Sequence, residues 1–399
     1  MARSKDKQPD LIGRLKRLVE IDSPTSDFKG VEKVLKWTEA ELKRLGFKTR
    51  RIRPEKAVKS PALLFAEMKS KSVSAPVITL ITHADTVFDS GFHGFKVSKD
   101  RKTATGPGVI DDKGGIVIAL EGLRLFLSRL PKKASAEITL QFICAPSEEI
   151  GSPGFHGFLA ETGKKTWMAL GFEPALETGD IIQTRRGNRW YRIDVQGAEA
   201  HSGREPEKGV NAAHELAHKI VGLEKIGIES PGASVQTGII QGGTRTNVVC
   251  GHAHARVDVR YSDFGSRDQV HSRIADLMSR PSTRPSVDGK RAQISLTLDD
   301  DCPPVPSPSP DTGRWVDEYL KSLGQAEGKT LKAGSGGGSA DVNYMSRPGL
   351  IILDGLGATG FGMHQKTETI FLESLKTRSE ALADFLSKVP THRKKSTQP

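Results

Sequence analysis

Several histidine and acidic residues follow runs that are typical of buried strands. They are His83 and Asp85 in THADT, Asp111 in GVIDDKGG, Glu148 and Glu149 in PSEEIG, and Glu173 in GFEP; a further histidine, His364 in GMHQKTE, stands near the C-terminus. Taken singly, each could be a structural hydrogen-bonding or surface residue. Open α/β sheets, however, place their ligand crevices at strand ends. Carboxylates that meet in one crevice repel one another unless a proton or a cation compensates them, and histidine nitrogen with carboxylate oxygen suits zinc or a neighbouring transition metal. The set therefore predicts a divalent metal centre.

The stretch GPGVIDDKGGIVIALEGLRLFL, residues 106–127, places two acids where a helix begins. Apolar residues recur at helical spacing after them, at Ile116, Val117, Leu120, Leu123 and Leu127. Gly114 and Gly115 relieve steric constraint at the helix entry. Negative charge is favoured at a helix N-terminus, so Asp111 and Asp112 could also be a helix cap.

The elements that must position these residues alternate between helix and strand. We expect helices at 10–21 and 31–46 and strands at 61–68, 76–87 and 136–149, which predicts an α/β layered sheet. From about Thr184 the order becomes strand, helix, two strands, helix, strand, which is typical of a ferredoxin-like α+β sandwich. The proline-rich run 300–310 is interpreted as a return linker, after which α/β character resumes. The expected domains are 1–183 and 303–399, forming one discontinuous domain, and the inserted 184–302.

Size and composition exclude several classes of protein. A chain of 399 residues has room for roughly two to three domains. Hydrophobic residues at 36% and charged residues at 27% indicate a globular chain without a bilayer-spanning run, and no membrane partner is expected. The charged N-terminus lacks the apolar stretch of a secretory signal, so we expect a cytoplasmic location. Three widely spaced cysteines fit neither a disulfide framework nor a cysteine zinc site.

The net charge of +11 is spread along the chain, and its one compact cluster is the tail THRKKSTQP, residues 391–399. We expect a solvated tail and no nucleic-acid partner, because no aromatic stacking segment or zinc-finger spacing accompanies the charge. Nucleic-acid contact through the tail stays open as an alternative.

Taken together, the motifs resemble the co-catalytic dizinc exopeptidase family that includes glutamate carboxypeptidase, acetylornithine deacetylase, succinyl-diaminopimelate desuccinylase and peptidase T. The resemblance runs from about residue 10 to 390, and DDKGG, FEP and DVRY are most similar to the glutamate carboxypeptidase branch. It implies a mixed-sheet, zinc-exopeptidase-like catalytic domain of phosphorylase/hydrolase-like type. It also implies that the inserted ferredoxin-like domain is a dimerisation or lid domain, and hence a homodimer.

The resemblance implies two divalent metal ions per subunit, zinc in the first place, with cobalt or manganese as alternatives. Asp111 is implied to bridge them. One site is then completed by His83 and Glu173, and the other by Glu149 and His364.

The same resemblance gives two further acids a role beside the metals. Asp85 lies two residues from His83, on the same side of a strand, and is implied to hold the imidazole. Glu148 is the implied general base, which takes a proton from water and delivers it to the leaving nitrogen.

Further site residues are implied by the motifs of the inserted domain. His201 in GAEAHSGREPEKGVNAA is implied to reach the partner subunit's active site and stabilise the oxyanion, or else it caps the turn that follows it. Asn247 and Arg260 match residues that bind the substrate carboxylate, for which the planar guanidinium fork is suited, although Arg260 could form a surface salt bridge instead. Gly337 and Gly338 of GSGGGSADVNY are implied to lie near the substrate, or to form a flexible turn.

Two departures from the family pattern stand close together. Cys250 occupies a position where proline is common in the family, which puts the local loop shape in doubt. His252 and His254 match no catalytic residue and are interpreted as surface or strand residues.

We therefore predict a zinc-dependent metallo-exopeptidase, a hydrolase of C–N amide bonds next to a free carboxylate. A carboxypeptidase that releases C-terminal glutamate or a similar residue from a small peptide or N-acyl amino acid is the leading hypothesis. An N-acyl-amino-acid deacylase or a dipeptidase would use the same metals and the same carboxylate anchor. A non-catalytic peptide-binding homologue is the alternative from another class.

Overall fold

The computed structural model describes residues 10–55, 58–88, 94–130 and 137–396, and the side chains of residues 390–396 are outside the description together with the rest of the basic tail. The chain divides into two compact units. The first comprises residues 1–184, 308–336 and 340–399, and the second residues 185–307 and 337–339. Among the described residues, no helix is both long enough and apolar enough to cross a membrane.

A six-stranded mixed sheet forms the centre of the first unit. Its strand order is β1 (Lys48–Ile52), β2 (Leu63–Met68), β6 (Thr139–Ala145), β3 (Val77–His83), β7 (Met168–Gly171) and β14 (Ile351–Leu353). β1, β2 and β6 pair antiparallel, whereas β6, β3, β7 and β14 run parallel. β3 and β6 are buried from their second residue onward, as their continuous apolar runs predict for strands covered on both faces.

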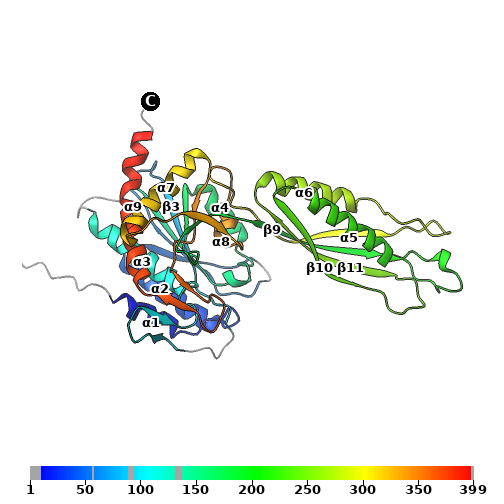
Figure 1. The fold of residues 1–399 in the computed structure, drawn as a ribbon, viewed down its shortest axis with the longest axis horizontal. Helices are drawn as coiled ribbons and strands as arrows, with labels where there is room; N and C mark the ends of the chain where they lie inside the picture. Colours follow the sequence, from blue (N-terminus) through cyan, green and yellow to red (C-terminus); the bar gives the residue numbers. More distant parts are fainter. Residues whose placement is uncertain (1–9, 56–57, 89–93, 131–136, 397–399) are drawn as a thin grey trace, which may run out of the picture. The chain divides into compact units, whose positions relative to one another are not determined.

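Helices bury this sheet and enclose the larger core. They are α1 (Leu11–Val19), α2 (Phe28–Arg44), α3 (Lys113–Arg129), α4 (His156–Lys165), α7 (Pro310–Glu327), α8 (Asp341–Met345) and α9 (Glu373–Ser396). α3 and α7 each pack against α9, α1 packs against α3, and α4 packs against α8 (Figure 1). α3 is buried along most of its length because its sequence is apolar on nearly every face. This burial holds its N-terminal end, where Asp111 and Asp112 lie, at a fixed place beside the sheet.

Two smaller sheets complete the first unit. One has the order β15 (Gly360–Phe361), β16 (Thr369–Phe371), β5 (Thr103–Thr105) and β4 (Lys96–Val97), and the other pairs β8 (Ile181–Arg185) with β13 (Ala333–Gly336). β5 leads into the Asp111 loop, and β15 and β16 flank His364. The first of these sheets therefore brings two distant parts of the chain to the same site.

The second unit is a four-stranded antiparallel sheet with two helices. Its elements are β9 (Gly187–Gln196), α5 (Ala212–Ile228), β10 (Ala233–Gly242), β11 (His252–Tyr261), α6 (Phe264–Met278) and β12 (Gln293–Cys302). The sheet order β10-β11-β9-β12 is that of the predicted ferredoxin-like sandwich. Every second residue of β11, from Ala253 to Tyr261, is buried, and the alternate side chains are exposed or half-buried. Figure 1 shows α5 and α6 along one face of this sheet.

The linker predicted at 300–310 is shorter in the structure. β12 continues through Cys302, because Asn188 and Arg189 of β9 pair with the last residues of this strand. The next helix, α7, already begins at Pro310, where Ser309 accepts a hydrogen bond from the Thr312 amide. The helix was not predicted, because a proline-rich run conceals a helix that has proline at its first position.

A buried ion pair fixes the second unit internally. The Glu215 carboxylate accepts hydrogen bonds of 2.8 Å from the amides of Ser282 and Thr283, and Lys219 Nζ lies 3.2 Å from the same carboxylate. Lys219 also donates to the carbonyl oxygens of Leu277 and Arg280. Burial alone would raise the pKa of Glu215, but the hydrogen bonds from Thr283 and Ser282 outweigh it and lower that pKa. The pair thereby ties α5 to the segment that follows α6.

We predict that Glu215→Gln lowers the free energy of unfolding by about 2–3 kcal/mol at neutral pH, because it leaves a buried ammonium without its counter-charge. Since the folded pKa of Glu215 lies below its ordinary value of about 4.3, its contribution is complete above that pH and is lost as the pH falls through the folded pKa. Urea unfolding of the full chain between pH 7 and pH 3 measures this difference. The exposed Glu224 on the same helix supplies the control, Glu224→Gln. Equal midpoints for Glu215→Gln and the control at pH 7 would contradict the prediction.

Candidate metal centre

Three neighbouring parallel strands end at the predicted metal centre. His83 is the last residue of β3, Glu148 and Glu149 follow β6 in a short 3-10 turn, and Glu173 follows β7. Because β6, β3 and β7 run parallel and adjacent, their carboxyl ends meet at one edge of the sheet. The three motifs, far apart in the sequence, are thus brought together by strand order.

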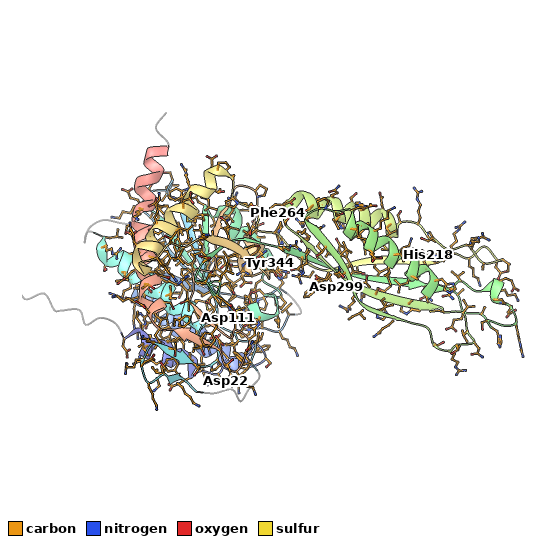
Figure 2. The ribbon with its side chains drawn as sticks, viewed as in Figure 1. Asp22, Asp111, His218, Phe264, Asp299 and Tyr344 are labelled. Atoms are coloured by element: carbon orange, nitrogen blue, oxygen red, sulfur yellow. The ribbon has the colours of Figure 1, made fainter. Side chains whose placement is uncertain are left out.

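Asp111 reaches the same edge from the loop between β5 and α3, and Figure 2 labels it inside the first unit. Asp112 is the N-cap residue of α3, but its side chain makes no capping hydrogen bond. Instead it accepts from the His83 amide at 3.1 Å. Gly115 permits this arrangement, because a Cβ there would lie 1.8 Å from the Asp112 carboxylate. Asp111 and Asp112 are therefore part of the candidate metal centre, and neither is a side-chain cap of α3.

The carboxylate of Asp111 lies between two histidines. His83 Nε2 is 2.9 Å from its Oδ1, and His364 Nε2 is 3.1 Å from its Oδ2. Glu173 lies on the His83 side, 3.9 Å from Nε2, and Glu149 lies on the His364 side, 3.5 Å from Nε2. Each oxygen of Asp111 thus faces one of the two groups of residues predicted to hold a metal.

Burial and mutual repulsion perturb the acids of the centre. Burial, followed by the nearby Glu173 carboxylate, raises the pKa of Glu148 well above its ordinary value. Burial and the charge of Asp111 raise the pKa of Glu149 to about 8. For His83, burial opposes protonation, but the carboxylates of Asp111 and Asp85 outweigh it and raise the pKa well above the ordinary value. Such a cluster of buried carboxylates favours a cation.

The donor atoms fit divalent metal ions. His83, Asp111 and Glu149 offer one set of donor atoms within 4.8 Å of one another, and His83, Glu148 and Glu173 offer another. Glu149 Oε1 is buried without a hydrogen-bond partner, although an unpaired buried oxygen is costly. Imidazole nitrogen and carboxylate oxygen together suit zinc and its neighbours in the first transition row. The residues present therefore fit divalent metal ions, although these two groups divide the residues differently from the predicted ligand sets.

Asp85 has two functions in the structure. His83 Nδ1 lies 3.1 Å from the carbonyl oxygen of Asp85 and 3.3 Å from its carboxylate, which leaves Nε2 directed at Asp111. The Asp85 carboxylate also accepts hydrogen bonds from the amides of Glu148 and Glu149, at 3.0 and 3.2 Å, and from the Thr25 hydroxyl. It therefore orients one proposed metal ligand and holds the turn that carries two further acids of the centre.

Glu368 is a site residue that sequence reasoning missed. Its fully buried carboxylate accepts hydrogen bonds from the amides of Gly108, Ile110 and Asp111, at 2.9, 2.8 and 3.1 Å. Burial raises the pKa of Glu368 to about 7 even though these bonds act in the opposite direction. It thereby ties the Asp111 loop to the segment that carries His364. Its position four residues after His364 could have indicated a role near the metal centre. An acidic residue at such a position is, however, equally typical of a surface loop.

Asp341, at the start of α8, is a second residue that was not predicted. Its side chain is buried, and burial raises the pKa of Asp341 to about 6. Its charge in turn raises the pKa of Glu148. The residue stands directly after the glycine-rich run 334–340, where the sequence drew attention to the glycines alone.

The predicted residues of the second unit form two groups. His201 pairs with Val248 in an isolated β-bridge, and the Ser202 amide donates to the carbonyl oxygen of Asn247, so His201 and Asn247 come from adjacent segments. The Gly203 amide donates to His201 Nδ1 at 3.2 Å, which is the turn contact that the capping alternative requires. With Nδ1 accepting, the proton of a neutral imidazole lies on Nε2, where it can be donated to a ligand.

Arg260 stands near the other end of β11. Its Nε lies 2.9 Å from Asp258 Oδ2, and Asp258 also accepts from Trp190 Nε1 at 2.8 Å. Among the described residues, the contact between Arg260 and Asp258 uses only Nε of the guanidinium. Both Nη groups of Arg260 are therefore available to a ligand. Gly337 and Gly338 are exposed, and Arg185 Nη1 donates to the Gly338 carbonyl oxygen at 2.8 Å. The glycine loop is therefore fixed at one end.

Known proteins are similar to this chain over nearly its whole length. The M20 peptidase dimerisation domain matches residues 183–284. Carboxypeptidase G2 of Pseudomonas sp. (strain RS-16) is 28% identical over 385 residues, covering 94% of this chain and 88% of that protein. Aminopeptidase PepT from Bacillus cereus has a TM-score of 0.72 at 21% identity, covering 95% of this chain and 98% of its own. The YXEP protein of Bacillus subtilis, described as a dinuclear metal-binding M20 peptidase, has a TM-score of 0.63 at 18% identity, covering 95% of this chain and 97% of its own.

The mixed sheet with its strand-end cluster of histidines and carboxylates defines a metallohydrolase. The similarity to carboxypeptidase G2 covers 94% of the chain, and the dimerisation-domain match lies in the second unit. The chain is thus similar to peptidases of the M20 family, including carboxypeptidase G2, and this agrees with the glutamate carboxypeptidase resemblance of its motifs.

We predict that Glu368→Gln weakens metal binding by about 10–100-fold, the range observed when a residue that supports metal ligands is lost. The amide can satisfy fewer of the three loop amides, so the Asp111 carboxylate loses its fixed position. Competition with a chromophoric chelator measures the affinity for Zn²⁺. Glu373→Gln, an exposed substitution at the start of α9, is the matched control. Unchanged zinc affinity in a folded Glu368→Gln protein would show that the loop holds its position without this carboxylate.

Proposed function

We propose that this protein is a two-metal carboxypeptidase that hydrolyses an amide bond next to a free carboxylate and releases C-terminal glutamate or a similar amino acid. The observation that carries the proposal is the Asp111 carboxylate, which faces a histidine and a second acid on each side. His83, Asp111 and Glu173 would hold one ion, and Asp111, Glu149 and His364 the other. Bound zinc ions would supply a Lewis acid and would ease the deprotonation of water near neutral pH.

The acids around the metals have separate tasks. Glu148 accepts a proton from the attacking water and transfers it to the leaving nitrogen, a role for which a pKa raised by burial is suited. Asp85 keeps His83 in the tautomer that presents Nε2 to the centre, and it holds Glu148 in place through its amide. Glu368 holds the Asp111 loop. Proton transfer and metal binding thus depend on one hydrogen-bonded network.

Arg260 is the proposed anchor for the substrate carboxylate. Asp258 orients its guanidinium through Nε, so that both Nη groups can form the paired hydrogen bonds that a carboxylate accepts. The residue is half-buried, which strengthens such a contact relative to one in open solvent. The loop at Gly337 and Gly338 is proposed as an additional substrate contact, and Asn247, which lies beside His201, is proposed to contact the substrate of the partner subunit.

The positions of His201 and Arg260 support a homodimer. Asn247 and His201 lie near the start of β11 and Arg260 near its end, and the eight steps from His252 to Arg260 span about 27 Å. A small substrate held by Arg260 is therefore beyond the reach of His201 in the same unit. We propose that His201 donates its Nε2 proton to the oxyanion in the partner subunit's site. The match of residues 183–284 to a dimerisation domain supports this arrangement.

A substrate panel tests the proposed activity. With zinc added, we expect chelator-sensitive release of glutamate from N-acyl-glutamates, including a folate-like one, and weaker hydrolysis of neutral dipeptides and acetylated neutral amino acids. A preference for a dipeptide or an acetylated neutral amino acid would instead assign a dipeptidase or deacylase activity.

The role of Glu148 is tested by a variant. Glu148→Gln should bind the same amount of zinc and lose activity by about 100-fold or more, since the general base is gone. Full activity of Glu148→Gln would refute its role as the base.

A second prediction concerns the carboxylate anchor. Arg260→Ala should lower kcat/KM by about 10–100-fold for a substrate with a terminal carboxylate, because a charge-assisted hydrogen-bonded pair is lost. It should have little effect on the same substrate with a terminal carboxamide, which the wild-type protein should hydrolyse poorly. Arg256→Ala, which removes an exposed arginine from the same face of β11, is the control. An equal loss with both substrates would assign Arg260 a structural role.

A further inference from the structure

We propose that the exposed face of the second unit carries an additional metal site, formed by Asp194, His252 and His254, for one divalent first-row transition-metal ion such as Zn²⁺. These residues have no part in the proposed hydrolysis. Their donor atoms, two imidazole nitrogens and one carboxylate oxygen, all lie within 4.8 Å of one another.

The strand register brings the three side chains together. His252 and His254 are two residues apart on β11, so their side chains leave the same face of the sheet. Asp194 on β9 stands directly opposite His254, and such pairs have Cβ atoms about 4.5–5.5 Å apart. The face is the one away from the buried alanines of β11, so it is open to solvent. Two rigid strands therefore hold all three residues.

The distances are close to those of a bound ion. His252 Nε2 lies 3.7 Å from Asp194 Oδ1, and the two imidazole rings are 5.9 Å apart between centroids. Donors about 2.1 Å from a tetrahedral zinc ion lie about 3.4 Å from each other, so small side-chain rotations suffice. His252 is about half exposed and can make such a rotation without disturbing the core. The arrangement needs no change of backbone.

The surroundings also suit a cation with open coordination positions. Arg192 Nε lies 3.2 Å from Asp194 Oδ2, which orients the carboxylate and leaves Oδ1 directed at His252. A pocket of about 290 Å³ adjoins the histidines and is also lined by Glu199, Gln196 and Gln241. Oxygen atoms of these side chains or water can complete the coordination of the ion. Two histidines with one carboxylate are a ligand set that binds zinc and its neighbours.

Counting bound zinc in the full-length protein tests the site. After equilibrium dialysis against micromolar Zn²⁺, the wild type should hold one ion per chain more than His252→Ala/His254→Ala. This difference does not depend on whether the catalytic residues are loaded, so the result stands apart from the proposed function. The matched control is Arg256→Ala, which removes an exposed side chain without a metal donor from the same face of β11 and should lose no ion. Equal zinc content in the wild type and His252→Ala/His254→Ala would overturn the proposal, as would an equal loss in the control.

Chemical modification locates the ion in the unaltered chain. Histidine acylation by diethyl pyrocarbonate, followed by peptide mass spectrometry, should be slowed about tenfold or more by Zn²⁺ at His252 and His254, because coordination blocks the nucleophilic nitrogen. His271, whose Nδ1 lies 2.8 Å from the Tyr191 hydroxyl, should react at the same rate with and without zinc. Asp194→Asn should reduce the protection while the protein keeps its fold, as circular dichroism can verify. Unprotected His252 and His254, or equal protection of His271, would exclude the site.

Discussion

The balance of charge around the Asp111 carboxylate is the constraint on which the first unit depends. Several acids and two histidines converge in a largely buried space, and burial raises the pKa of Glu148 and Glu149 because it penalises their charged forms. Asp111 stays ionised because His83 and His364 each contact one of its oxygens, and these contacts lower its pKa despite burial. A pair of metal ions in this space would compensate the remaining negative charge.

The scaffold that holds this charge in place has two parts. Three adjacent parallel strands deliver His83, the Glu148–Glu149 turn and Glu173 to one edge of the sheet. The Asp111 loop is the second part, and the buried Glu368 carboxylate accepts a hydrogen bond from its Asp111 amide. Lys113 also holds this loop, because its Nζ donates to the Ile21 carbonyl oxygen at 2.9 Å. Burial lowers the pKa of Lys113 to about 8. Acids whose mutual repulsion would otherwise separate them are thus fixed by backbone hydrogen bonds.

The second unit uses the two faces of one sheet for different purposes. The face under α5 and α6 is apolar and forms the core, whereas the other face carries polar side chains along β9 and β11. Arg260 and its partner Asp258 lie toward one end of this polar face, and His252 and His254 lie at the other. His201 and Asn247 lie near the same end as His252, but Asp194, His252 and His254 make none of the proposed substrate contacts. The two sites therefore share no residues.

The sequence by itself determined the fold class, the order of the elements and the residue types of the metal centre. Continuous apolar runs predicted β3 and β6, and the helical spacing after Asp111 predicted α3. The order of strands and helices predicted the ferredoxin-like unit. These features can be predicted because burial on a regular element imposes a periodic pattern on its own sequence. The short motifs that follow the strands indicated which residues could bind a metal.

Only the tertiary structure decided which of these residues meet and what holds them. Glu368 could not be distinguished from a surface acid, since its partners are backbone amides some 260 positions earlier in the chain. The sequence likewise left open whether Asp112 caps a helix, and its bond to the His83 amide became visible only after folding. His252, His254 and Asp194 are unremarkable in the sequence, because strand register alone makes them neighbours. Hydrogen bonds and register between distant segments leave no periodic pattern in either segment, so they become apparent only in three dimensions.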